Sequence, residues 1–299
     1  MFKKIIKLFK RTLYKNKVKK ERSLSLEEQD ILNVDKTELQ KKTILVFDQH
    51  KRLFLTKEKY SVVALFCPVK KEFYIFSSTG SMQTIRFNPL DDSEFAYPIA
   101  GDWAGNGYDG IGLYYPGAGL ALFKNEINND NNVDLSKDYN IEKEYMPLAG
   151  NWYGKGVDTL SFYDKEKSVF LFPEDGAESS VIFFGKQGEN YIPISGDWND
   201  DGYDAVGLYE PETSLFRLNN TLEANRADAI IRFGKKQQGG SEFLPISGNW
   251  KGEGTDSFGI YEKNTGIFRL KNKPATGKAD SLFKVDFQNL IPLSISVAV

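Results

Sequence analysis

The chain has 299 residues, of which 40% are hydrophobic, with 39 basic and 41 acidic side chains. That length allows one large or two ordinary domains with a substantial core. A single histidine, His50, and a single cysteine, Cys67, exclude a zinc site made of Cys and His ligands and a disulfide framework. No apolar run reaches the roughly 18 residues of a membrane-spanning helix, so we expect none.

The first 20 residues differ in charge from the rest of the chain. They contain nine of the 39 basic residues and no acidic one, so the other 30 basic residues face 41 acidic ones and residues 21–299 have a net charge of −11. Lysines interrupt the apolar residues of this tail, which argues against a secretory signal peptide. We therefore expect a cytoplasmic or peripheral membrane protein, with an extracellular location reached by a non-Sec route as the alternative.

On a helix, the apolar residues of the tail would form one stripe and the lysines would fill the other face. Such a helix can lie in an anionic membrane surface with its apolar side down. A plain basic tail is the alternative, and a nucleic-acid partner is a third that we do not expect. The candidate membrane contacts are Phe2, Ile5, Ile6, Phe9, Lys3, Lys4, Lys7 and Lys10. Residues 21–42 are polar and charged, which is typical of a linker.

A repeated unit organises the chain after about residue 43. Four segments align without gaps, and all four tryptophans take the same place in them. They begin at Pro98, Pro147, Pro193 and Pro245 and read PIAGDWAGNGYDGIGLY, PLAGNWYGKGVDTLSFY, PISGDWNDDGYDAVGLY and PISGNWKGEGTDSFGIY. Their spacings are 49, 46 and 52 residues, and a further start follows 47 residues later at Pro292. A degenerate unit around 60–95 precedes them, so the array contains five units.

Within a unit, short segments rich in β-branched and aromatic residues alternate with Gly, Asn, Asp and Pro, which indicates strands. One unit predicts strands at 192–198, 204–209, 215–218 and 229–233. Four strands in about 48 residues are typical of a β-propeller blade. We therefore predict an all-β chain, with a basic helical tail and linker over 1–42 and a five-bladed propeller over 43–299. The alternative is a sixth blade that the C-terminal strand and the hairpin 44–56 share.

The loop between the first two strands of a unit carries the only motif with candidate site chemistry. In one copy oxygen-bearing side chains occupy positions 1, 3 and 5 and Gly202 follows, as in the front half of an EF-hand-type calcium loop. The candidate Ca²⁺ ligands are Asp197, Asn199, Asp201 and Asp204, with Asp102, Asn106 and Asp109 as a weaker set. The alternative is a turn that Asp and Asn side chains hold without a metal.

The unit resembles the FG-GAP/VCBS-type propeller repeat, as in the N-terminal propeller of integrin alpha chains. In that family a Phe-Gly pair ends one blade and a G-D-[FW]-N-G-D-G-like loop follows in the next. Here Phe184-Gly185 and Phe233-Gly234 precede two of the repeat starts. The resemblance covers residues 43–299. It implies a propeller fold, loops that hold Ca²⁺, and an extracellular adhesion or carbohydrate-associated role.

The loops also depart from the family pattern. Ala205 stands where the family has a carboxylate at position 9, and Ala104 takes position 3 of the loop that begins at Asp102. Lys155 takes position 5 of another loop, where its ammonium group cannot coordinate a cation. In the last loop, Lys251 and Glu253 predict an internal ion pair.

Four aspartates recur at the end of these loops. A pair of carboxylates could serve a glycosidase, but catalytic groups break the symmetry of a repeat, whereas structural groups follow it. We therefore expect them to fix the turn into the second strand, and the four tryptophans to pack between blades. The aspartates are Asp109, Asp158, Asp204 and Asp256. The leading hypothesis is a non-enzymatic propeller that binds a protein or a glycan. The alternatives are a secreted or surface calcium-dependent lectin and, third, a carbohydrate-active enzyme.

Overall fold

The computed structural model divides into two compact units, residues 1–55 and residues 56–299. The structure describes residues 43–47, 53–57, 59–78, 80–91, 93–141, 145–173, 179–222, 226–236 and 242–298. The tail with all its candidate membrane contacts, the linker and His50 lie outside the described residues. Strands β1 (Thr43–Phe47) and β2 (Leu53–Lys57) form a two-stranded sheet of their own.

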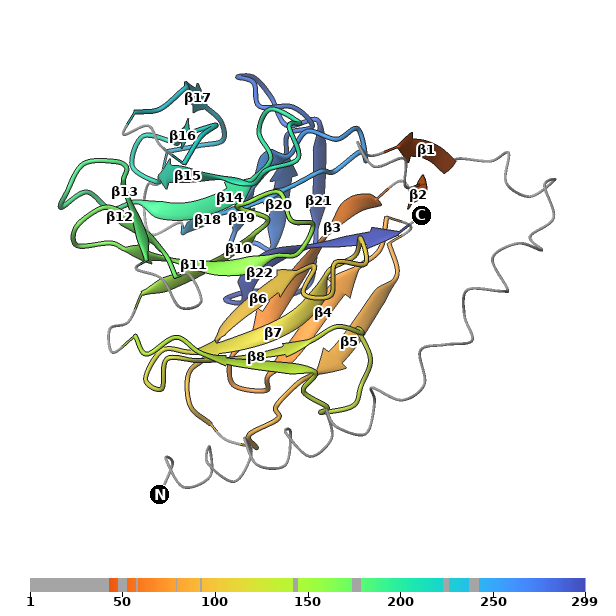
Figure 1. Ribbon diagram of the computed structural model, residues 1–299. Coiled ribbons are helices and arrows are strands. Elements are labelled where there is room, and N and C mark those ends of the chain that lie inside the picture. Colours follow the sequence, from red (N-terminus) through yellow and green to blue (C-terminus); the bar gives the residue numbers. More distant parts are fainter. Residues whose placement is uncertain are drawn as a thin grey trace. The chain divides into compact units, whose positions relative to one another are not determined.

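Twenty strands of the larger unit form five antiparallel sheets of four strands each (Figure 1). The first sheet has the order β22 (Ile291–Ala298), β3 (Lys59–Cys67), β4 (Glu72–Phe76), β5 (Met82–Arg86). The second runs through β6 (Tyr97–Gly101), β7 (Gly110–Tyr115), β8 (Leu120–Lys124) and β9 (Leu135–Asp138). The third runs through β10 (Met146–Gly150), β11 (Thr159–Asp164), β12 (Val169–Phe172) and β13 (Ser180–Phe183).

The fourth sheet contains β14 (Ile192–Gly196), β15 (Ala205–Glu210), β16 (Leu215–Leu218) and β17 (Ala229–Arg232). The fifth contains β18 (Phe243–Gly248), β19 (Ser257–Glu262), β20 (Ile267–Leu270) and β21 (Ser281–Lys284). The four strands predicted in the unit at 192–233 are confirmed to within two residues at each end. We number the sheets blade 1 to blade 5 in this order.

The first strands of the five blades form a closed ring, because β22 contacts β6, β6 contacts β10, β10 contacts β14, β14 contacts β18 and β18 contacts β22. The five-bladed propeller is therefore confirmed. The sixth-blade alternative is wrong, because β22 pairs with β3 while β1 and β2 pair with each other.

Blade 1 joins distant parts of the chain. β22 lies antiparallel to β3 from Ile291↔Phe66 to Ala298↔Lys59, and Figure 1 shows this blue strand beside the orange strands of the first blade. Ile295, at the middle of β22, is fully buried. The last strand of the array thus supplies the first strand of its first blade, and the ring needs no strand from outside the larger unit.

Hydrophobic side chains fill the spaces between neighbouring blades. Trp103 of blade 2 packs with Leu160 and Phe162 of blade 3, and Trp198 of blade 4 packs in one cluster with Phe258 and Ile260 of blade 5. Trp152 and Trp250 take the same place between blades 3 and 4 and between blades 5 and 1. The prediction that the tryptophans pack between blades is confirmed.

The described residues contain no helix that is long and apolar enough to cross a membrane. Cys67, at the end of β3, is half-buried and has no disulfide partner.

Candidate functional site

The loops between the first and second strands of blades 2 to 5 lie at one end of the propeller. Their sequences put glycines against the next blade: a Cβ atom on Gly105 would lie 2.9 Å from Val157, and one on Gly154 would lie 2.5 Å from the ring of Tyr203. We call this surface the loop face, and it consists of residues 102–109, 151–158, 197–204 and 249–256 with Lys59 and Tyr60.

The first residue of each loop closes that loop with its own side chain. Asp197 accepts the amide of Asp201 on Oδ1 (3.1 Å) and the amide of Gly202 on Oδ2 (2.8 Å). Asp102 does the same for the amides of Asn106 and Gly107, at 2.9 and 2.7 Å. Asn occupies this position in the other two loops. Asn151 Oδ1 accepts the Gly156 amide, and Asn249 Oδ1 accepts the Glu253 amide. An Asn suffices here because a single oxygen acceptor holds the turn.

The last residue of each loop joins its blade to the preceding one. In each case a carboxylate accepts a backbone amide of the neighbouring blade, and its own amide donates back to the carbonyl of the same residue. That residue is the first of its loop in three cases and Ser296 of β22 in the fourth. The acceptor pairs are Asp158 with the Asp102 amide (2.7 Å), Asp204 with Asn151 (2.6 Å), Asp256 with Asp197 (2.9 Å) and Asp109 with Ser296 (2.7 Å). The return bonds measure 2.8 to 3.3 Å.

A serine completes this ring of contacts in blade 1. The Asn249 amide donates to Ser61 Oγ (2.9 Å), and the Ser61 amide donates to the Asn249 carbonyl (2.8 Å). Five reciprocal pairs therefore connect the five blades, and a neutral acceptor serves at one of them. The prediction that the aspartates fix the turn into their own second strand is wrong, because their carboxylates hold the neighbouring blade instead.

The four carboxylates share a poorly hydrated environment. Burial raises the pKa of Asp109 to about 8 and that of Asp204 to about 7, and the negative charge of Asp158 adds to both shifts. Burial likewise raises the pKa of Asp158, and it raises the pKa of Asp256 well above its usual range. The positive charge of Lys59, at the start of β3, opposes all four shifts. Ionising any of these four carboxylates in the folded chain therefore costs free energy.

The candidate calcium ligands do not converge on one point. Asp197 uses both oxygens on amides of its own loop, and Asp201 accepts from Asn199 Nδ2 (2.9 Å) and the Tyr203 amide (2.9 Å). Asp204 is directed toward blade 3 instead.

The weaker set behaves in the same way. Asp102 closes its loop, Asn106 accepts the Tyr108 amide (3.1 Å), and Asp109 is directed toward Ser296. No group of three or more His, Cys, Asp or Glu side chains in the described part of the chain is arranged to hold a metal ion.

The two lysine-containing loops use their ammonium groups internally. Lys251 Nζ lies 3.9 Å from Glu253 Oε1, which confirms the predicted ion pair. Lys155 Nζ lies 5.4 Å from the centre of the Tyr153 ring, a cation–π distance. Neither loop presents an isolated charge at its tip.

Exposed aromatic side chains gather on the loop face. Tyr108, Tyr153 and Tyr203 are 37, 39 and 51% exposed, and Val157 of the same face is 38% exposed. Tyr108, Val157 and Tyr203 each directly precede an aspartate of the ring, which fixes their positions around the propeller. These tyrosines were not predicted as site residues from the sequence, although the place of Tyr108 and Tyr203 in the repeat, directly before Asp109 and Asp204, was a usable signal.

No family model and no curated protein matches this chain. Among solved structures, the chain is similar to virginiamycin B lyase from Staphylococcus aureus, with 8% identity and a TM-score of 0.34 over 85% of this chain and 79% of that one. It is also similar to AofleA from Arthrobotrys oligospora, with 10% identity and a TM-score of 0.39 over 79% of this chain and 71% of that one.

Proposed function

We propose that this chain is a non-enzymatic binding module whose loop face binds a protein or a glycan. The observation that carries the proposal is the presence of three exposed tyrosines at one end of a closed propeller. Exposed aromatic groups with a polar tip are enriched at binding surfaces, because they offer a large contact area and a hydrogen-bonding group at a low cost in conformational entropy.

The carboxylates of the ring support a binding role over a catalytic one. Each of the four accepts a backbone amide of the neighbouring blade, and the same geometry recurs around the ring. A catalytic pair would need two carboxylates with distinct environments and access to a substrate. Here the repeat assigns all four carboxylates one role, which is to join blades.

We expect the variant Tyr108→Ala/Tyr153→Ala/Tyr203→Ala to lose at least about tenfold in affinity for the ligand, because the loss of each ring removes exposed aromatic contact area from the loop face. Partners are identified with the wild-type chain by pull-down and on a glycan array, and binding is then measured with both proteins. Phe183→Ala is the matched control, since Phe183 is 59% exposed on the outer strand β13. Equal loss in both variants would contradict the loop face as the site.

Two finer assignments belong to the same proposal. The Phe-Gly pairs and the loop motif favour an FG-GAP/VCBS-type repeat, and the adhesion and lectin roles of that family make a calcium-dependent glycan ligand the second outcome of the array. Repeating the array in EDTA separates the two outcomes. Binding that EDTA abolishes would favour the lectin, and binding that EDTA leaves unchanged would favour the metal-free loops.

The basic tail supports a peripheral attachment to anionic membranes. The nine basic residues and the apolar residues among them are the basis for this part of the proposal. We expect the full chain to sediment with vesicles that contain phosphatidylserine, and a variant lacking residues 1–41 to stay in the supernatant. Equal sedimentation of the two proteins would reject the tail as the anchor.

A further inference from the structure

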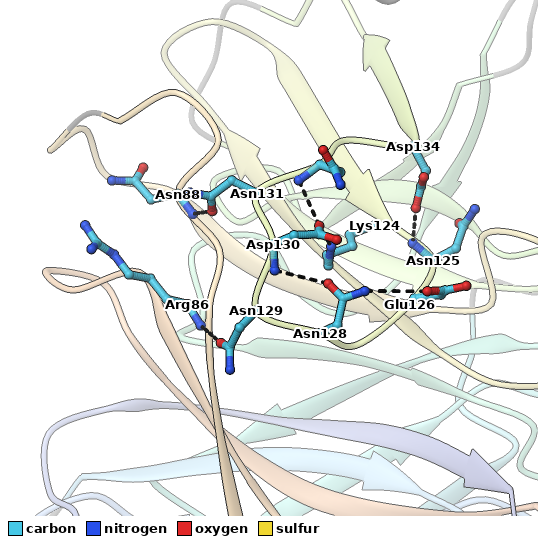
Figure 2. A network of polar contacts seen from close by, with 11 residues as sticks. Arg86, Asn88, Lys124, Asn125, Glu126, Asn128, Asn129, Asp130, Asn131 and Asp134 are labelled. Carbon is cyan, nitrogen blue, oxygen red and sulfur yellow. Dashed lines mark hydrogen bonds and ion pairs between the residues drawn. The ribbon is translucent and has the colours of Figure 1, made fainter. Parts of the chain in front are cut away.

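The loop between β8 and β9, residues 125–134, reaches from blade 2 to blade 1, and we call it the strap. Its two ends are tied together: the Asn125 amide donates to Asp134 Oδ2 (2.9 Å), and the Asp134 amide donates to the carbonyl of Phe123 (2.9 Å). Figure 2 shows the polar side chains that occupy nearly every position between these ends. The strap is therefore an ordered loop with fixed ends.

Alternate side chains of the strap hold it from within. The Asp130 amide donates to Asn128 Oδ1 (3.1 Å), and the Asn132 amide donates to Asp130 Oδ1 (3.0 Å). The ammonium group of Lys124 forms an ion pair with Asp130 beneath the loop, and its side chain is only 2% exposed. A buried cation with this partner fixes the middle of the strap, because moving the loop away would leave the charge without compensation.

The two asparagines between these positions point to the other blade (Figure 2). Asn129 Oδ1 accepts the backbone amide of Arg86 (3.1 Å), and Asn131 Oδ1 accepts that of Asn88 (3.0 Å). The amide of Phe87, between them, donates to the carbonyl of Lys71 inside blade 1 (2.9 Å). The strap thus offers two acceptors, two residues apart, to the amides of Arg86 and Asn88, which face outward from blade 1.

β5 is the outer strand of blade 1, and among the described residues it pairs only with β4. An outer strand with unpaired amides is a template on which another chain can add a strand. The corresponding loop of blade 5, residues 271–280, makes its described hydrogen bonds and ion pairs within its own blade, such as Lys271 Nζ to Asp280 Oδ1 (3.0 Å). Hydrogen bonds to the outer strand of a neighbouring blade are therefore not a general property of these loops.

We propose that the strap covers the C-terminal end of the outer edge of β5, at Arg86 and Asn88, and thereby prevents this edge from pairing with β5 of a second copy of the chain. Asn129 and Asn131 occupy two of the donors that a strand partner would use, the amides of Arg86 and Asn88, and Lys124 keeps the loop in place. Blade 1 is also the blade in which β22 and β3 meet from distant parts of the chain.

The test uses the full chain with Asn129→Ala/Asn131→Ala, analysed by light scattering over a hundredfold range of concentration. We expect the double variant to show a larger average mass than wild type at the same concentration, and we expect this mass to grow with concentration. Thr84, at the centre of β5, is exposed, so Thr84→Cys in this background should give a cross-linked dimer that Thr84→Cys alone does not give. Asn129→Asp/Asn131→Asp keeps the acceptor oxygens and should behave as wild type.

Equal masses for the folded double alanine variant and wild type, without cross-linking, would overturn the proposal. Hydrogen exchange on the wild-type chain provides a test that needs no variant. The Arg86 amide should exchange about tenfold more slowly than the amide of Lys284, its counterpart on the outer strand β21. Equal exchange rates at the two positions would equally overturn it.

Discussion

Replacing Asp204 by asparagine should raise the melting temperature at pH 8 by about 5 °C while leaving it nearly unchanged at pH 4.5. The pKa of Asp204 in the folded chain is about 7, against an ordinary value of 3.8. Because the folded pKa is the higher one, the stability that the protonated group contributes is present below pH 3.8 and is lost as the pH rises through 7.

The size of the effect follows from the environment of the carboxylate. Each unit of pKa shift corresponds to about 1.4 kcal/mol, and since the side chain is half-buried we expect the charged form to cost on the order of 2 kcal/mol at pH 8. Asn keeps an oxygen acceptor for the Asn151 amide, and Ser61 shows that a neutral acceptor can serve at this position. The variant therefore removes the charge and retains the contact between blades.

Thermal unfolding from pH 4.5 to 8.5 measures this difference. Asp204→Ala should lower the melting temperature at every pH, because the Asn151 amide loses its acceptor at a cost of about 1–3 kcal/mol. Asp200→Asn is the matched control, since it removes one charge from an exposed position of the same loop. If Asp204→Asn were destabilising at pH 8 by as much as Asp204→Ala, the carboxylate would be charged and stabilising, contrary to a pKa raised by burial.

The sequence predicted the blades well because their signals are local. The spacing of the tryptophans, the strand-forming segments and the Gly-rich turns all recur within one unit, so the alignment of the units gives the number of blades. The pairing of β22 with β3 was less certain, because the hairpin 44–56 offered a second partner of similar composition. Only the register Ile291↔Phe66 through Ala298↔Lys59 decided between them.

The roles of individual side chains depended on contacts between units, which periodicity does not report. Asp204 follows a calcium-like spacing with Asp197 and Asp201, yet its acceptor bond goes to Asn151 of the preceding blade. Asn129 and Asn131 belong to a polar run typical of a solvated loop, and their partners lie 43 residues earlier in the chain. Local spacing indicated oxygen-rich turns correctly, but it gave neither the direction nor the partner of each oxygen.

Deleting residues 291–299 should abolish the cooperative unfolding transition of the propeller. β22 forms the full pairing with β3 and contacts β6 and β18, so its loss opens the ring on two sides. The Asp109 carboxylate also loses the Ser296 amide. We expect the free energy lost with these contacts to be of the order of the stability of a whole domain, about 5–15 kcal/mol. Circular dichroism during thermal unfolding measures the transition.

A point variant in β22 tests the contribution of this strand within a chain of full length. Ile295→Ala should cost about 2–5 kcal/mol, because the side chain is fully buried at the centre of the strand. Leu282→Ala, at a 63% exposed position on the outer strand β21, is the matched control and should change stability by less than about 0.5 kcal/mol. A synthetic peptide of residues 290–298 added to the truncated chain should restore the transition, since the ring lacks only that strand. A truncated chain that unfolds cooperatively at the wild-type temperature without the peptide would show that β22 does not close the ring.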